Sequence, residues 1–63
     1  MKISETKVKL LMATFKINQQ MLAERAGISR QTLSAVMNGR SCRPEILGKL
    51  VEALDTEPEK IIE

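Results

Sequence analysis

The sequence contains no histidine, tyrosine or tryptophan, and its only aromatic residue is Phe15. Surfaces that bind RNA or single-stranded DNA stack bases on aromatic side chains, so this scarcity argues against both ligand classes. Without histidine, the chain lacks the general base of serine–histidine and cysteine–histidine catalysis. The single cysteine, Cys42, can form neither an intramolecular disulfide nor a zinc site. We therefore expect no metal, no cofactor and no enzymatic activity.

Long hydrophobic runs are also missing from the sequence. No apolar stretch approaches the ~20 residues that a membrane-spanning helix needs, and no signal peptide is visible, so we expect a cytoplasmic protein that does not bind membranes. The 63 residues are 43% hydrophobic and 29% charged, which suits one small globular domain over residues 1–63. We expect Cys42 to be an ordinary exposed residue of a loop.

Charged residues are distributed unevenly along the chain. Residues 1–43 hold eight basic and two acidic residues, a balance of +6, whereas residues 44–63 hold two basic and six acidic residues, a balance of −4. One region would then attract a polyanion and another would repel it. Charge alone does not separate this interpretation from a solvated surface on which the charges happen to segregate.

Cap residues and apolar spacing predict about five short helices and no strand, so the expected fold class is all-α. Ser4 caps the first helix, whose apolar stripe is Val8, Leu11, Met12 and Phe15. Pro44 lies in the first turn of a fourth helix, whose stripe is Ile46, Leu47, Leu50, Val51 and Leu54. A capping box at residues 56–59 predicts a short fifth helix that carries Ile61 and Ile62.

The second and third helices are expected at residues 19–26 and 30–37. Asn18 and Ser29 are good N-cap residues for these two helices. Gly27 ends the second helix with the positive φ that glycine allows. The third helix is expected to end at residues 38–39, Asn-Gly, in a second left-handed stop, and a basic polar loop follows it.

The stretch at residues 19–38 combines three features that a helix-turn-helix needs. The small side chain of Ala23 lets the second of the two helices approach closely, and Gly27 supplies the turn four residues later. Apolar side chains fill the angle between the helices: Leu22, Ala26, Ile28, Leu33 and Val36. Each feature is weak alone, but their coincidence over twenty residues is specific.

With these residues the chain resembles the compact helix-turn-helix domain of the phage repressors and Cro proteins, the Xre-type regulators, from about Val8 to Ile62. The motifs are INQQMLA at 17–23, AGISRQTLS at 26–34, NGR at 38–40 and RP at 43–44. The resemblance implies a lambda-repressor-like helical domain that binds double-stranded DNA, with a recognition helix over about residues 29–37 in the major groove. It further implies a transcriptional repressor that binds a palindromic operator as a homodimer, formed in solution or only on DNA.

The resemblance also implies roles for individual residues. Four would contact bases: Arg30, Gln31, Ser34 and Ala35. Arginine pairs bidentately with guanine and glutamine with adenine, while the Ala35 methyl suits a thymine methyl. Six would contact phosphates: Asn18, Gln19, Thr32, Asn38, Arg40 and Arg43. Three are structural residues of the motif: Ala23, Gly27 and Ser29.

The sequence departs from the family pattern at two places. Many relatives carry a buried Arg–Glu pair between the first and third helices, and the corresponding positions here are Met12 and Met37. We hypothesise that an apolar contact replaces the ion pair, a change that is often neutral or stabilising because no charge is desolvated. Met21 stands where relatives often have a polar residue, and we expect it to be exposed without an explanation for it.

A protein-interaction module is the alternative function. An antitoxin-type protein would dock its partner through the C-terminal half of the chain. Ile61 and Ile62 would then form an exposed apolar patch rather than part of the core. This alternative is compatible with DNA binding, and a co-encoded protein recovered with the chain would favour it.

Overall fold

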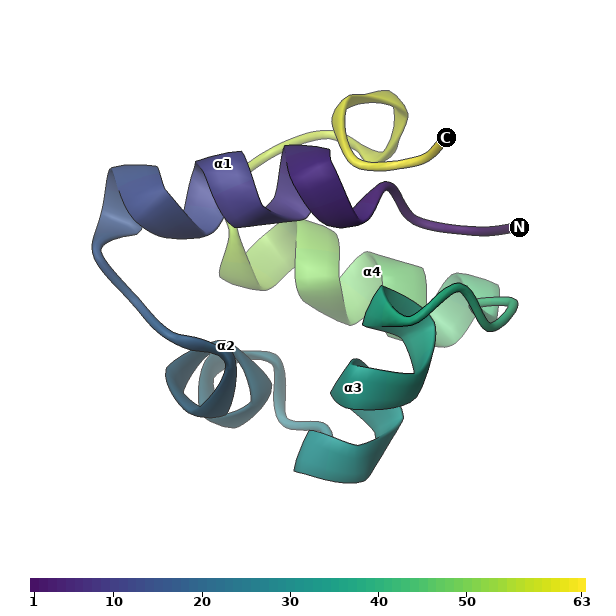
Figure 1. The fold of residues 1–63 in the computed structure, drawn as a ribbon, viewed down its shortest axis with the longest axis horizontal. Helices are drawn as coiled ribbons and strands as arrows, with labels where there is room; N and C mark the ends of the chain where they lie inside the picture. Colours follow the sequence, from purple (N-terminus) through teal and green to yellow (C-terminus); the bar gives the residue numbers. More distant parts are fainter.

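Four α-helices and one turn of 3-10 helix make up the structure, a computed structural model that describes all residues from 1 to 63 (Figure 1). The elements are α1 (Glu5–Phe15), α2 (Gln19–Ala26), α3 (Arg30–Met37), α4 (Pro44–Ala53) and the 3-10 turn η1 (Pro58–Lys60). The only β pairing is an isolated antiparallel bridge between Ile3 and Ile62. The predicted all-α class is confirmed. None of the helices combines the length and apolar character that crossing a membrane would require.

The core contains apolar side chains and no buried polar or charged residue. Its members come from every α-helix and from both chain ends: Ile3, Val8, Met12, Ile17, Leu22, Ala23, Ala26, Leu33, Val36, Met37, Cys42, Leu47, Leu50, Leu54 and Ile61. In this core α2 packs against both α3 and α4, and α4 packs against η1. Figure 1 shows that both chain ends lie beside α1, on the side of the molecule opposite to the first turn of α3.

The predicted helix caps of α1, α2 and α3 are present. The side chains of Ser4, Asn18 and Ser29 each accept a hydrogen bond from a backbone N–H three residues later, at 3.3, 2.8 and 3.0 Å. Gly27 ends α2 with φ 70°, as its position predicts. After α3 only Gly39 is left-handed, with φ 100°, because Asn38 has φ −89°. The left-handed conformation that was expected after α3 is therefore adopted by Gly39 and not by Asn38.

The predicted fifth helix is wrong in length and in its cap. Only Pro58–Lys60 form a turn of 3-10 helix, and no side chain caps it. The N–H of Thr56 donates to the carbonyl of Val51 and so closes the end of α4, while Asp55 reverses the chain at φ 50°. Thr56, the first residue of the expected capping box, thus ends α4 and does not cap a fifth helix.

The exposed patch that the alternative function requires at Ile61 and Ile62 is absent. Ile61 is 0% exposed and belongs to the core, and Ile62 is half-buried and paired with Ile3. The carbonyl of Ile61 accepts a hydrogen bond from the N–H of Ser4 at 2.6 Å. Because the N-terminal segment already covers these residues, they cannot serve as an open docking surface.

The expected exposure of Cys42 is wrong, and one residue of the apolar stripe of α1 is less buried than the others. Cys42 was expected on the surface, yet it is 2% exposed because its loop packs under the N-terminal residues, and its N–H donates to the carbonyl of Met1. Burial raises the pKa of the Cys42 thiol, and the N-terminal ammonium opposes that shift. Phe15 is 38% exposed although it continues the apolar stripe of α1. It is the last helical residue, and Lys16 turns the chain away there with φ 56°.

Both methionines that are expected at the positions of the ion pair lie inside the molecule. Met12 and Met37 are buried members of the same apolar core, which is the environment that the hypothesis requires. A direct contact between the two side chains stays a prediction. Met21 is 41% exposed on α2, as expected, and nothing in the structure explains why a methionine is there.

Two glycines allow the turn conformation to be tested apart from packing. A methyl group would meet no atom within 4 Å at Gly27 or at Gly48, so neither Gly27→Ala nor Gly48→Ala creates a clash. Gly27→Ala should destabilise the protein by about 1 kcal/mol because φ is positive there. Gly48→Ala, within α4, should stabilise it by up to about 1 kcal/mol. Urea unfolding of both variants measures this, and a destabilisation shared by both would contradict it.

Candidate nucleic-acid interface

A three-residue turn, Gly27–Ser29, joins α2 to α3. The N–H of Ile28 donates to the carbonyl of Ala23 at 3.0 Å, which brings the turn back against α2. Ala23 is 3% exposed, so a larger side chain has no room there. The remaining side chains inside the angle are apolar and buried or packed on the core: Leu22, Ala26, Ile28, Leu33 and Val36. The predicted helix-turn-helix arrangement is therefore present.

The outer face of α3 carries polar and small side chains. Arg30 and Gln31 are exposed at its first turn, and three further residues are half-buried along the same helix: Thr32, Ser34 and Ala35. Neither Arg30 nor Gln31 donates a side-chain hydrogen bond within the protein. The two ion pairs of the structure, Glu5–Lys9 and Glu45–Lys49, lie on other helices. The donors at the start of α3 are thus free for an external partner.

Two open depressions flank α3, and Arg40 lines both of them. One has a volume of about 420 Å³ and is lined by Gln31, Ser34, Ala35, Asn38 and Arg40. The other has a volume of about 400 Å³ and extends from α3 across the loop to α4; it is lined by Thr32, Ala35, Val36, Arg40, Ser41, Arg43, Glu45 and Ile46. The outer face of α3 thus lies between two depressions, and each depression is lined by at least one arginine. This shape and charge suit a polyanion that has a groove.

The start of α4 adds a second source of positive potential beside the loop. Its N-cap residue, Arg43, makes no side-chain cap hydrogen bond, so the first N–H groups of α4 have no capping partner. Free N–H groups and the helix dipole both favour an anion at this end. Arg40 and Arg43 are exposed, and neither takes part in an ion pair. Glu45 is the one acidic residue of the first turn, and Lys49 pairs with it at 3.7 Å.

The structure brings together most of the residues expected at the site. Those of α3 and of the following loop line the two depressions, except Arg30, which lies exposed at the start of α3. Asn18 and Gln19 are at the start of α2 and line neither depression. Four lining residues were not among those expected at the site: Val36, which was expected in the core, Ser41, Glu45 and Ile46. The Arg-Pro pair that begins α4 is the signal that could have pointed to the last two.

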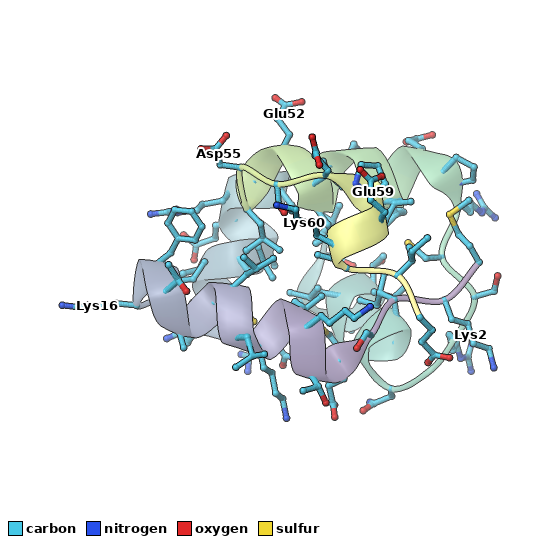
Figure 2. All side chains as sticks on the ribbon, turned by 90° about the horizontal axis from the view of Figure 1, so that it is seen from above. Lys2, Lys16, Glu52, Asp55, Glu59 and Lys60 are labelled. Atoms are coloured by element: carbon cyan, nitrogen blue, oxygen red, sulfur yellow. The ribbon has the colours of Figure 1, made fainter.

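Several acidic side chains lie at the end of α4 and around η1. In Figure 2 Glu52 and Asp55 project outward from the end of α4, Glu59 lies farther along the same side, and Lys60 lies among them. The separation of charge is partial, because Glu45 at the start of α4 lines the second depression beside Arg40 and Arg43, and Lys7 of α1 donates to the carbonyl of Ile62.

The cap of α3 should support the site without contacting a ligand itself. The hydroxyl of Ser29 accepts from the N–H of Thr32 and donates to the Thr32 hydroxyl at 2.7 Å. Ser29→Ala removes both bonds and should cost about 1 kcal/mol of unfolding free energy. Ser29→Asp, which keeps a cap acceptor and suits the helix dipole, should restore most of it. Thermal unfolding compares the variants; equal stability of Ser29→Ala and the wild type would contradict this role.

Comparison with known proteins finds a family and a similar solved structure. The model of the helix-turn-helix family matches residues 8–61. A solved structure described as native PhpD with cadmium atoms aligns with a TM-score of 0.84 and 25% sequence identity. The alignment covers 100% of this chain and 14% of that one, so this chain spans a small part of the other protein's length. The curated proteins contain no match.

Proposed function

The chain belongs to the Xre/Cro/CI-type helix-turn-helix family of DNA-binding regulators, and from this premise we propose that it represses transcription by binding a specific duplex sequence. The observation that carries the proposal is the free polar face of α3. Arg30 and Gln31 are exposed at the first turn of that helix and make no hydrogen bond within the protein. An α-helix fits the major groove of B-DNA, where base edges present a distinct pattern for each base pair.

Base recognition is assigned to four residues of α3. Arg30 would donate two hydrogen bonds to a guanine, and Gln31 would pair with an adenine. Ser34 and Ala35, one turn later, line the depression beside Gln31 and would contact the next base pairs, Ala35 through a thymine methyl. Each bidentate pair contributes about 1–3 kcal/mol of discrimination against the wrong base.

Phosphate binding is assigned to residues on either side of α3. Asn18 and Gln19 lie at the start of α2, where the helix dipole favours an anion. The hydroxyl of Thr32 already accepts from Ser29, which leaves its own hydrogen free for a phosphate oxygen. The remaining three follow α3: Asn38, Arg40 and Arg43. Such contacts set the register of the protein on DNA and carry no sequence information.

Two copies of the chain would bind a palindromic operator. One recognition helix reads only a half-site, so linkage of two half-sites about one helical turn apart supplies the remaining affinity. Selection from randomised duplexes tests this proposal directly, because it returns the bases, their symmetry and the half-site spacing. Light scattering with and without the selected duplex then tells whether the homodimer forms in solution or only on DNA.

Arg30→Ala tests the base contact. It should remove the preference at one base position of each half-site and leave binding to random duplexes nearly unchanged. Arg25→Ala is the matched control, because Arg25 is equally a surface cation but lies at the end of α2 in a separate hollow with α4. Repeating the selection with both variants gives the answer. An unchanged preference in Arg30→Ala would mean that α3 does not read the bases.

Arg40→Ala tests the phosphate contact. It should weaken binding to all duplexes by a similar factor and reduce the slope of log K against log salt by about one. Binding isotherms at several salt concentrations measure the slope. Lys60→Ala, which removes a cation on the acidic side (Figure 2), should leave it unchanged. A loss confined to one DNA sequence would instead make Arg40 a base contact.

A further inference from the structure

The loop between α3 and α4 has few anchors of its own. At its start the N–H of Arg40 donates to the carbonyl of Ala35 in α3, and at its end the carbonyl of Arg43 accepts from Leu47 in α4. Between these points the backbone of Ser41 and Cys42 makes no hydrogen bond to α3 or α4. These two residues lie between the arginines that are proposed to bind phosphate.

Met1 supplies the missing anchor from outside the loop. Its carbonyl accepts from the N–H of Cys42 at 2.6 Å and from the hydroxyl of Ser41 at 3.4 Å. Cys42 is buried in the core beneath this contact. The centre of the loop is therefore held by the N-terminal segment.

Ile3 fixes that N-terminal segment to the body of the protein. Its side chain is 2% exposed, and it pairs with Ile62 in the antiparallel bridge. On either side of it, the carbonyl of Lys2 accepts from the N–H of Glu63, and the N–H of Ser4 donates to the carbonyl of Ile61. In Figure 1 this segment passes between the C-terminal residues and the loop that leads into α4.

We propose that Ile3 is a positioning residue for DNA binding, which holds Arg40 and Arg43 in place beside α3 through Met1 and the Ser41–Cys42 backbone. The proposal rests on the DNA-binding function proposed above. A loop that is ordered before binding does not pay the entropy of ordering its arginines when the phosphates arrive. Without the buried side chain of Ile3, the arginines would be ordered only when DNA binds, and the entropy lost in that step would lower the affinity.

A mutant cycle separates positioning from general stability. Ile3→Ala should weaken binding to any duplex by roughly 3- to 10-fold, the factor for ordering one or two long side chains. In the Arg40→Ala/Arg43→Ala background the same change should have less than about a twofold effect, because no arginine is left to position. Leu54→Ala, a core truncation at the other end of α4, should have equal effects in both backgrounds. All variants are compared below their unfolding temperatures.

Cys42 provides a second measurement that needs no DNA. Its thiol is buried with a raised pKa, so a thiol reagent reacts with it only when the loop opens. The mild variant Ile3→Val, chosen in case Ile3→Ala does not fold, should speed labelling of Cys42 by more than Leu54→Val does at matched stability. Equal labelling rates in the two valine variants, or equal losses of affinity in both arginine backgrounds, would overturn the positioning role. If the labelling result held but the wild type bound no duplex, the proposed function would fail, and Ile3 would be shown to order the loop without a role in DNA binding.

Discussion

The geometry of the whole surface depends on the return of the chain at Gly27–Ser29. Gly27 adopts a backbone conformation that other residues reach only with strain, and the N–H of Ile28 then finds the carbonyl of Ala23. Because Ala23 is small and buried, α3 can leave the turn with its apolar side on the core and its first turn at the edge of the molecule. A turn without this left-handed conformation would change the direction of α3 and with it the position of every polar side chain on its outer face.

The core and the surface of this protein have separate chemical tasks. No charged or polar residue is buried, and Met12 and Met37 belong to a core that is entirely apolar. No arginine takes part in an ion pair within the protein, so those at the start of α3 and in the following loop have no internal partner. A small domain gains from this division, since a buried pair would need desolvation energy that 63 residues can hardly supply.

Features that arise within a few residues could be predicted from the sequence, and features that arise between the chain ends could not. The caps at Ser4, Asn18 and Ser29 depend on neighbours three residues away, and helix spacing located the core of all four α-helices. The burial of Cys42 and Ile61 follows from the pairing of residues 1–4 with the loop after α3 and with the C-terminal residues, which no local pattern encodes. The helix period also predicts which residues share the outer face of α3, because these residues are close in the sequence. Ser41 and Glu45 lie on the far side of the second depression, and no local pattern predicts that they face α3.

The net charge of +2 is too small to explain attraction to DNA, so the arrangement of the charges must supply it. Arg43 and Glu52 lie at opposite ends of α4, roughly 13 Å apart along the helix axis at 1.5 Å per residue. This separation exceeds the screening length of about 8 Å at physiological salt. The acidic end therefore cancels little of the attraction at the basic end, and Lys49 pairs with Glu45, the one carboxylate that lines the second depression. A polyanion would meet a local excess of positive charge beside α3 and repulsion at the other end of α4, which favours one orientation of approach even before any base is contacted.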